Sequence, residues 1–275
     1  MILSGQLVLA VLTAVLLGMA SSAQVQRVRY RAEGQGHFLP KLVAVIVLLN
    51  ALLFAWRVQH GGIHTAVRSS FDLTVLLVTM LTAVAWFSER NRAVLGLDGL
   101  LLPIATLLQI GAFATVLHEP KPAEAAAWFV VHQLSIVVGG ALFICAGLGG
   151  AVYLLLLRAL RRRPPSAMLG RFAPLETWER LGRWCTLLGF GFFTFGILTG
   201  ICRVFHTAEL NRPRWLTDKF ILLCFVLWGV YALGLLATWL VPSFRGRRAA
   251  FLAAGSGAVL VGVFLVVDYL SVVHR

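Results

Sequence analysis

The chain has 275 residues, of which 59% are hydrophobic and 13% are charged. Soluble domains carry about 25% charged residues, so this composition excludes an ordinary soluble protein. The formal net charge is +13, but no soluble basic domain carries it, which argues against binding of nucleic acid. Basic residues of this kind instead suit contact with an anionic lipid bilayer.

Eight apolar blocks follow one another along the chain, and a hydrocarbon core of about 30 Å takes roughly 17–25 helical residues to cross. They predict transmembrane helices over residues 2–23, 41–57, 71–88, 96–117, 128–157, 184–205, 220–241 and 249–271. Helices satisfy their backbone hydrogen bonds internally, as lipid requires. The sequence therefore predicts an all-α, polytopic membrane bundle of about eight helices, organised as a single domain over residues 1–275.

The first block could also be a secretory signal peptide, which is short and apolar too. The small residues Ser21, Ser22 and Ala23 would suit a peptidase. However, the first basic residue is Arg27, which follows the apolar run instead of preceding it. This order favours a retained helix whose N-terminus lies outside, with cleavage as the alternative.

The distribution of Lys and Arg predicts the orientation of the bundle. Segments 24–41, 89–95, 158–183 and 242–248 hold 16 of the 24 basic residues. Basic residues gather on the cytoplasmic side of a membrane, so we expect these segments inside and both termini outside. We expect a multi-pass protein of the plasma or inner membrane. Within the longest inside segment, residues 175–181 indicate a short interfacial helix that leads into the sixth span.

Six of the seven histidines fall in segments that this orientation places outside. They are His60, His64, His118, His132, His206 and His274. A neutral imidazole binds haem iron well, and two imidazoles on opposite sides give a six-coordinate centre. His132 at the outer end of the fifth span and His274 just past the eighth are candidate ligands of the iron. The alternative is that these histidines are only polar residues located at the membrane–water interface.

The longest outside loop, between the sixth and seventh spans, combines charged and aromatic residues. It contains His206, Arg212, Arg214, Trp215 and Asp218. Arginines can pair with the two haem propionates, and an indole can cover a porphyrin face. Upstream, His64 lies eight residues before Asp72 at the start of the third span. Tryptophan is also enriched at membrane interfaces without any ligand, so the loop alone leaves both explanations open.

Several motifs occur in a fixed order along the chain. They are the pair His64 and Asp72, the segment His132-Gln133-Leu134-Ser135 opening a glycine-rich helix, Gly196-Ile197-Leu198-Thr199-Gly200, Trp215 with Asp218-Lys219, the basic turn 244–250, and His274. In this order they resemble the CcsA/HemX-like cytochrome c assembly membrane proteins, which handle haem. The resemblance covers the chain from about residue 50 to its end.

This resemblance implies that His132 and His274 are the axial ligands of a b-type, non-covalently bound haem on the outer face. The Trp215 loop would form the surface that presents haem to apocytochrome c, together with another cytochrome c biogenesis membrane protein. The chain departs from the full family pattern, because its loop has Trp215 alone and residues 233–237 lack the expected intramembrane histidine. These departures are closer to the short HemX-like branch.

Three functions are consistent with the sequence. The first is a haem-binding protein that holds or presents haem for cytochrome c assembly. The second is a HemX-like regulatory or interaction protein of tetrapyrrole biosynthesis that acts through its cytoplasmic basic loops. The third is a small-molecule transporter, which broken helices and midplane charges would support. The sequence shows no catalytic triad, P-loop or soluble catalytic domain, which favours haem handling over independent enzymatic activity.

Overall fold

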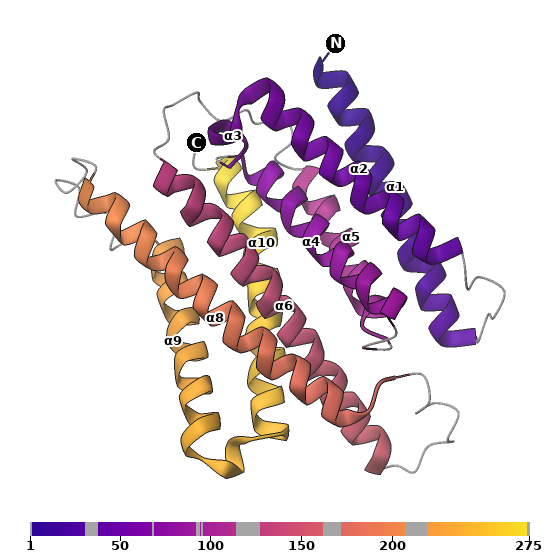
Figure 1. Cartoon of the computed structure of the whole chain (residues 1–275), viewed down its shortest axis with the longest axis vertical. Helices are drawn as coiled ribbons and strands as arrows, with labels where there is room; N and C mark the ends of the chain where they lie inside the picture. Colours follow the sequence, from indigo (N-terminus) through magenta and orange to yellow (C-terminus); the bar gives the residue numbers. More distant parts are fainter. Residues whose placement is uncertain are drawn as a thin grey trace. The chain divides into compact units, whose positions relative to one another are not determined.

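The computed structural model describes residues 2–30, 38–67, 69–91, 94, 96–113, 127–161, 172–206 and 219–273. All regular structure in these residues is helical. The long helices are α1 (Ile2–Tyr30), α2 (Phe38–Gly61), α4 (Ser70–Asn91), α5 (Asp98–Ala112), α6 (Ala127–Arg161), α8 (Leu175–His206), α9 (Lys219–Leu240) and α10 (Arg247–Val273) (Figure 1). The short elements are α3 (Ile63–Ala66) and a 3-10 turn at Pro242–Phe244. The predicted all-α fold with eight long helices is confirmed.

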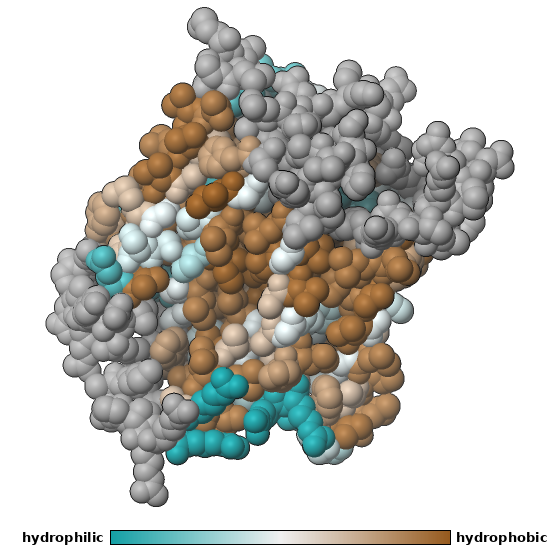
Figure 2. Space-filling model, turned by 180° about the vertical axis from the view of Figure 1, so that it is seen from behind, coloured by the Kyte–Doolittle hydropathy of each residue, from teal (hydrophilic) through white to brown (hydrophobic). Residues whose placement is uncertain are grey.

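Seven of these helices are long and apolar enough to cross a membrane. The eighth, α5, has only 15 residues and contains Pro103, which cannot donate a backbone hydrogen bond within the helix. Its predicted span of 96–117 is described only as far as residue 113. The described residues on the face in Figure 2 are mainly hydrophobic, and large side chains such as Leu48, Phe87 and Leu233 are more than half exposed. Such a surface suits contact with lipid, and the protein is a multi-pass membrane protein.

Helix α8 begins earlier than hydropathy predicts. The sixth span was expected from residue 184, with a short interfacial helix at 175–181 leading into it, but the structure has one continuous helix from Leu175. The side chains of Glu179 and Arg183 form an ion pair at 3.1 Å across the expected boundary. The prediction was wrong because charged residues end an apolar run without ending a helix, and pairs one turn apart support the helix in water.

The chain divides into two compact units, which we describe separately. Unit 1 comprises residues 1–121, 155–178 and 264–275, and unit 2 comprises residues 122–154 and 179–263. In unit 1, α1 packs against α2 and α5, and α4 packs against the same two helices. Their core includes Ala10, Leu53, Phe71, Val75 and Ala112. Four helices therefore surround one interior.

Glycines set the helix packing in unit 2. A Cβ atom added at Gly147 of α6 would lie 2.8 Å from the Cα of Gly257 of α10, so these two backbones touch. Small residues of this kind allow the close helix approach that is common in membrane proteins. The ring of Phe143 stacks on that of Tyr231 from α9, with centroids 3.6 Å apart. Aromatic rings thus fill the interior where the glycines leave space.

Candidate functional site

His132 is the sixth residue of α6, and its ring is fixed by α8. Its Nδ1 atom lies 2.6 Å from the carbonyl oxygen of Gly196. A carbonyl oxygen can only accept a hydrogen bond, so Nδ1 carries the proton and donates it. In the neutral imidazole, Nε2 is then the nitrogen with the lone pair. The structure therefore selects the tautomer of His132 that can bind a metal through Nε2.

Two glycines of α8 make room for this arrangement. A Cβ atom at Gly200 would lie 2.8 Å from Cε1 and 3.1 Å from Nδ1 of His132. A Cβ atom at Gly196 would lie 2.7 Å from Cδ1 of Ile136, the next α6 residue on this face. The spacing Gly196-x-x-x-Gly200 is of the small-xxx-small kind that allows close helix approach, and the structure has such a contact here. What the pattern did not predict is that the partner at Gly200 is the imidazole itself.

His132 is half-buried, and the buried ring of Phe129 lies one turn before it with centroids 6.4 Å apart. Within the described residues, no group of three or more His, Cys, Asp or Glu side chains is placed to hold a metal ion. A metal-binding role therefore rests on His132 and on partners beyond that part of the chain.

The other predicted site residues are placed only in part. His206 ends α8 and His64 lies in α3, and for both only the backbone is described. His118, Arg212, Arg214, Trp215, Asp218 and His274 lie outside the described residues. The pairing of His132 with His274, and the role of the Trp215 loop, stay predictions.

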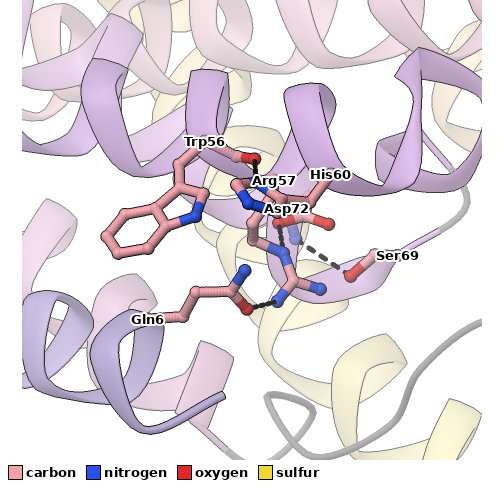
Figure 3. A network of polar contacts seen from close by, with 6 residues as sticks. All are labelled: Gln6, Trp56, Arg57, His60, Ser69 and Asp72. Atoms are coloured by element: carbon pink, nitrogen blue, oxygen red, sulfur yellow. Dashed lines mark hydrogen bonds and ion pairs between the residues drawn. The ribbon is translucent and has the colours of Figure 1, made fainter. Parts of the chain in front are cut away.

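A second polar cluster lies in unit 1, where α1 begins and α2 ends (Figure 3). The guanidinium group of Arg57 forms an ion pair with Asp72, and its Nη1 atom donates a hydrogen bond of 2.9 Å to Oε1 of Gln6. The side chains of Arg57 and Asp72 are 12% and 2% exposed. The guanidinium carbon also lies 5.3 Å from the ring centroid of Phe71. A buried charge of this kind needs its partner, because desolvation is costly.

Local structure explains how Asp72 is held. Its backbone N–H donates to Oγ of Ser69, 3.3 Å away, so Ser69 caps the first turn of α4 (Figure 3). On α2, His60 is exposed and its Nδ1 donates to the carbonyl oxygen of Trp56 at 2.9 Å. The sequence drew attention to Asp72 through its spacing from His64. It missed Arg57 and Gln6, whose signal is that they are polar residues at the ends of apolar blocks.

A matching cluster lies at the opposite end of unit 1, where α1 ends and α5 begins. Gln24 donates a hydrogen bond from Nε2 to the carboxylate of Asp98, the first residue of α5. Nearby, Arg27 pairs with Glu89 of α4 at 2.7 Å. These contacts join α1, α4 and α5, so each end of the four-helix interior closes on a buried carboxylate.

The fold defines a membrane protein in which seven of the described helices are long and apolar enough to span the bilayer, and in which a histidine of α6 is hydrogen-bonded to α8. Residues 3–274 match the family described as Cytochrome C assembly protein, and the chain belongs to that family. No match was found among the curated proteins or among the solved structures. Membership places the role of the chain in cytochrome c maturation, among proteins associated with haem and with other components of cytochrome c biogenesis. The resemblance seen in the sequence is confirmed.

Proposed function

We propose that this protein binds a b-type, non-covalent haem at the outer membrane face and presents it for cytochrome c assembly. The observation that carries the proposal is the hydrogen bond from Nδ1 of His132 to the Gly196 carbonyl oxygen at 2.6 Å. Metal-binding histidines commonly donate their other ring nitrogen to a carbonyl or carboxylate, which fixes the ring and raises its basicity. His132 has this arrangement, with Nδ1 donating to the carbonyl oxygen of Gly196.

The residues of the family motifs supply the remaining parts of the proposed site. His132 and His274 would hold the haem iron, and Trp215 would contact the porphyrin. Arg212 and Arg214 would pair with the propionates, with His206, Asp218 and His64 around them. Haem itself would be the group that is transferred to apocytochrome c, and the thiols of apocytochrome c would form the covalent links. The chain itself would position haem and bind its iron.

The proposed location is the plasma or inner membrane, with the N-terminal end of α6 facing outward. The basic residues of segments 158–183 and 242–248 support this orientation, because such residues remain cytoplasmic. Apocytochrome c and another cytochrome c biogenesis membrane protein are the proposed partners at the outer face.

The test is the optical spectrum of the detergent-purified protein, reduced with dithionite after addition of haemin. A sharp α-band is expected for the wild type, and weakening or loss of that band for His132→Ala and His274→Ala. His60→Ala is the matched control, because His60 is an exposed histidine of unit 1 whose hydrogen bond among the described residues is to Trp56 of its own helix. A wild type that stays colourless with excess haemin, or a His132→Ala variant with an unchanged spectrum, would refute the proposal.

A HemX-like regulatory role is the second candidate. It is favoured by the single tryptophan in residues 203–219 and by the absence of histidine from residues 219–240. In that case the cytoplasmic basic segments would contact an enzyme of tetrapyrrole biosynthesis. Charge-removing substitutions in residues 158–163 would then abolish the cellular effect, whereas His132→Ala would preserve it.

A further inference from the structure

Polar side chains line the interior face of α1 in unit 1. Gln6, Thr13 and Gln24 are 8%, 0% and 4% exposed, and they share this face with the buried Ala10 and Leu17. Their spacing is seven and eleven residues. Both spacings bring a helix back to within about 20° of the same face. Gln6 contacts α2 and Gln24 contacts α5. These two contacts fix which residues of α2 and α5 lie at the same level as Thr13.

The contact between Gln24 and Asp98 sets the register of α1 against α5, which runs in the opposite direction (Figure 1). Thr13 lies eleven residues before Gln24 on α1, and Gln109 lies eleven residues after Asp98 on α5. Because the helices are antiparallel, both residues lie about 16 Å from the contact in the same direction. An intermediate point confirms the register, because a Cβ atom at Gly18 would lie 4.0 Å from Cγ2 of Thr106. The register therefore places Thr13 and Gln109 at about the same level along α1 and α5, and both side chains are buried.

The contact between Gln6 and Arg57 sets the register of α1 against α2 in the same way. Seven residues inward on each helix, about 10 Å away, lie Thr13 and Asn50. Asn50 belongs to the buried face of α2 and lies between the buried residues Ile46 and Leu53 in sequence. Two independent registers thus bring three polar residues from three helices to one level, in the middle of unit 1.

The amides at this level lack hydrogen-bond partners among the described residues. Asn50 and Gln109 are both fully buried, and neither the oxygen nor the nitrogen of either amide is bonded. The hydroxyl of Thr13 donates to the carbonyl oxygen of Ala10 at 2.9 Å, which leaves its oxygen able to accept. Two buried and unbonded amides in a membrane interior carry a large desolvation cost unless a ligand bonds them.

We propose that Thr13, Asn50 and Gln109 form an internal site that binds water in the middle of unit 1. The chemistry of the three groups selects the ligand. A cation would leave both amide NH2 groups unbonded, and an anion would leave both amide oxygens unbonded. Water donates and accepts, and buried water typically bonds two to four otherwise unsatisfied polar groups. The site lies between the Arg57–Asp72 cluster at one end of the interior and the Gln24–Asp98 cluster at the other.

The first test is radiolytic hydroxyl-radical footprinting of the full chain in lipid nanodiscs. Radicals formed from a bound water molecule label the side chains beside it, even where bulk solvent has no access. Leu17 and Leu53 are both 0% exposed and lie one turn from Thr13 and Asn50. Labelling of these two leucines is expected in the wild type, with a several-fold loss in the double variant Asn50→Leu, Gln109→Met.

A control variant separates this site from general loosening of the bundle. Thr82 is equally buried, but its hydroxyl donates to backbone oxygens of its own helix at 2.8 and 3.0 Å. Thr82→Val is therefore expected to leave the labelling of Leu17 and Leu53 unchanged. Unlabelled leucines in the wild type would overturn the proposal, and this result does not depend on the folding of any variant.

The second test is a double-mutant cycle on thermal unfolding. If Asn50 and Gln109 bond the same water, Asn50→Leu and Gln109→Met each lower the Tm, and the second change adds little to the first. If the interior is dry, each substitution removes an unbonded amide and raises the Tm, which would also overturn the proposal. Neither test uses haem, so the outcome is independent of the proposed function.

Discussion

Substitution of Gly200 by alanine tests whether α8 seats the imidazole of His132. The new Cβ atom would lie 2.8 Å from Cε1 and 3.1 Å from Nδ1 of the ring. Carbon atoms pack at about 3.5–4.0 Å, so the imidazole ring must move away from α8 by about 0.7 Å or more. That movement breaks the bond between Nδ1 and the Gly196 carbonyl oxygen, because α8 carries both the obstacle and the acceptor.

The expected cost follows from these terms. Overpacking costs about 1–3 kcal/mol, and loss of the hydrogen bond costs about 0.5–1.5 kcal/mol. Alanine offsets about 1 kcal/mol through its better helix propensity. The net loss is about 0.5–3.5 kcal/mol. Since 1.4 kcal/mol corresponds to a factor of ten, haemin affinity should fall by roughly 2- to 300-fold when this loss falls on the bound state.

The matched control is Gly191→Ala, in the same helix, where an added Cβ atom meets nothing within 4 Å. This variant should keep the haemin affinity of the wild type and unfold at an equal or higher temperature. The assays are haemin titration by absorbance and thermal unfolding in the same detergent. Equal haemin affinities for Gly200→Ala and Gly191→Ala would refute the argument that Gly200 positions the ring.

Two further predictions concern stability and use thermal unfolding. Asp72→Asn leaves Arg57 buried without its counter-charge, so we expect a destabilisation of about 3–5 kcal/mol. Arg183→Ala breaks an exposed pair and should cost at most about 1 kcal/mol; similar effects of the two changes would contradict the burial argument. In Gly147→Val the new Cβ atom would lie 2.8 Å from the Cα atom of Gly257, so α6 must move away from α10. This change should lower the free energy of unfolding by about 2–3 kcal/mol. Gly255→Val, where nothing lies within 4 Å, should cost clearly less, and equal losses would show that the glycine contact does not hold these helices together.

The sequence predicted the membrane-spanning helices because hydropathy is a local property. The same locality explains what it missed. Arg57 and its partners Gln6 and Asp72 come from three helices that only the fold brings together. Such pairs depend on the register between helices, which an apolar pattern does not specify. The early start of α8 was missed for the converse reason, since its first turns carry charged residues that a hydropathy window excludes.

The predicted site divides along the same line. His132 was identified from its place at the end of an apolar block within a family motif, and the structure seats it against α8. The tautomer of its ring could not be predicted, because it depends on one carbonyl oxygen 64 residues away. The remaining site residues lie mostly between residues 207 and 218 and after residue 273, outside the described part of the chain. For them the sequence is still the source of the hypothesis.

The segment Gly196-Ile197-Leu198-Thr199-Gly200, which carried part of the family resemblance, now has a physical explanation. Gly196 clears Ile136 and offers its carbonyl oxygen to His132, while Gly200 clears the ring. The hydroxyl of Thr199 lies 2.9 Å from the same carbonyl oxygen, and also 2.9 Å from that of Phe195. Its single proton can turn to Phe195 and leave the Gly196 oxygen to the imidazole. Gly200 therefore makes room for the imidazole and Gly196 supplies its hydrogen-bond acceptor, which explains why small residues occupy the face of α8 opposite His132.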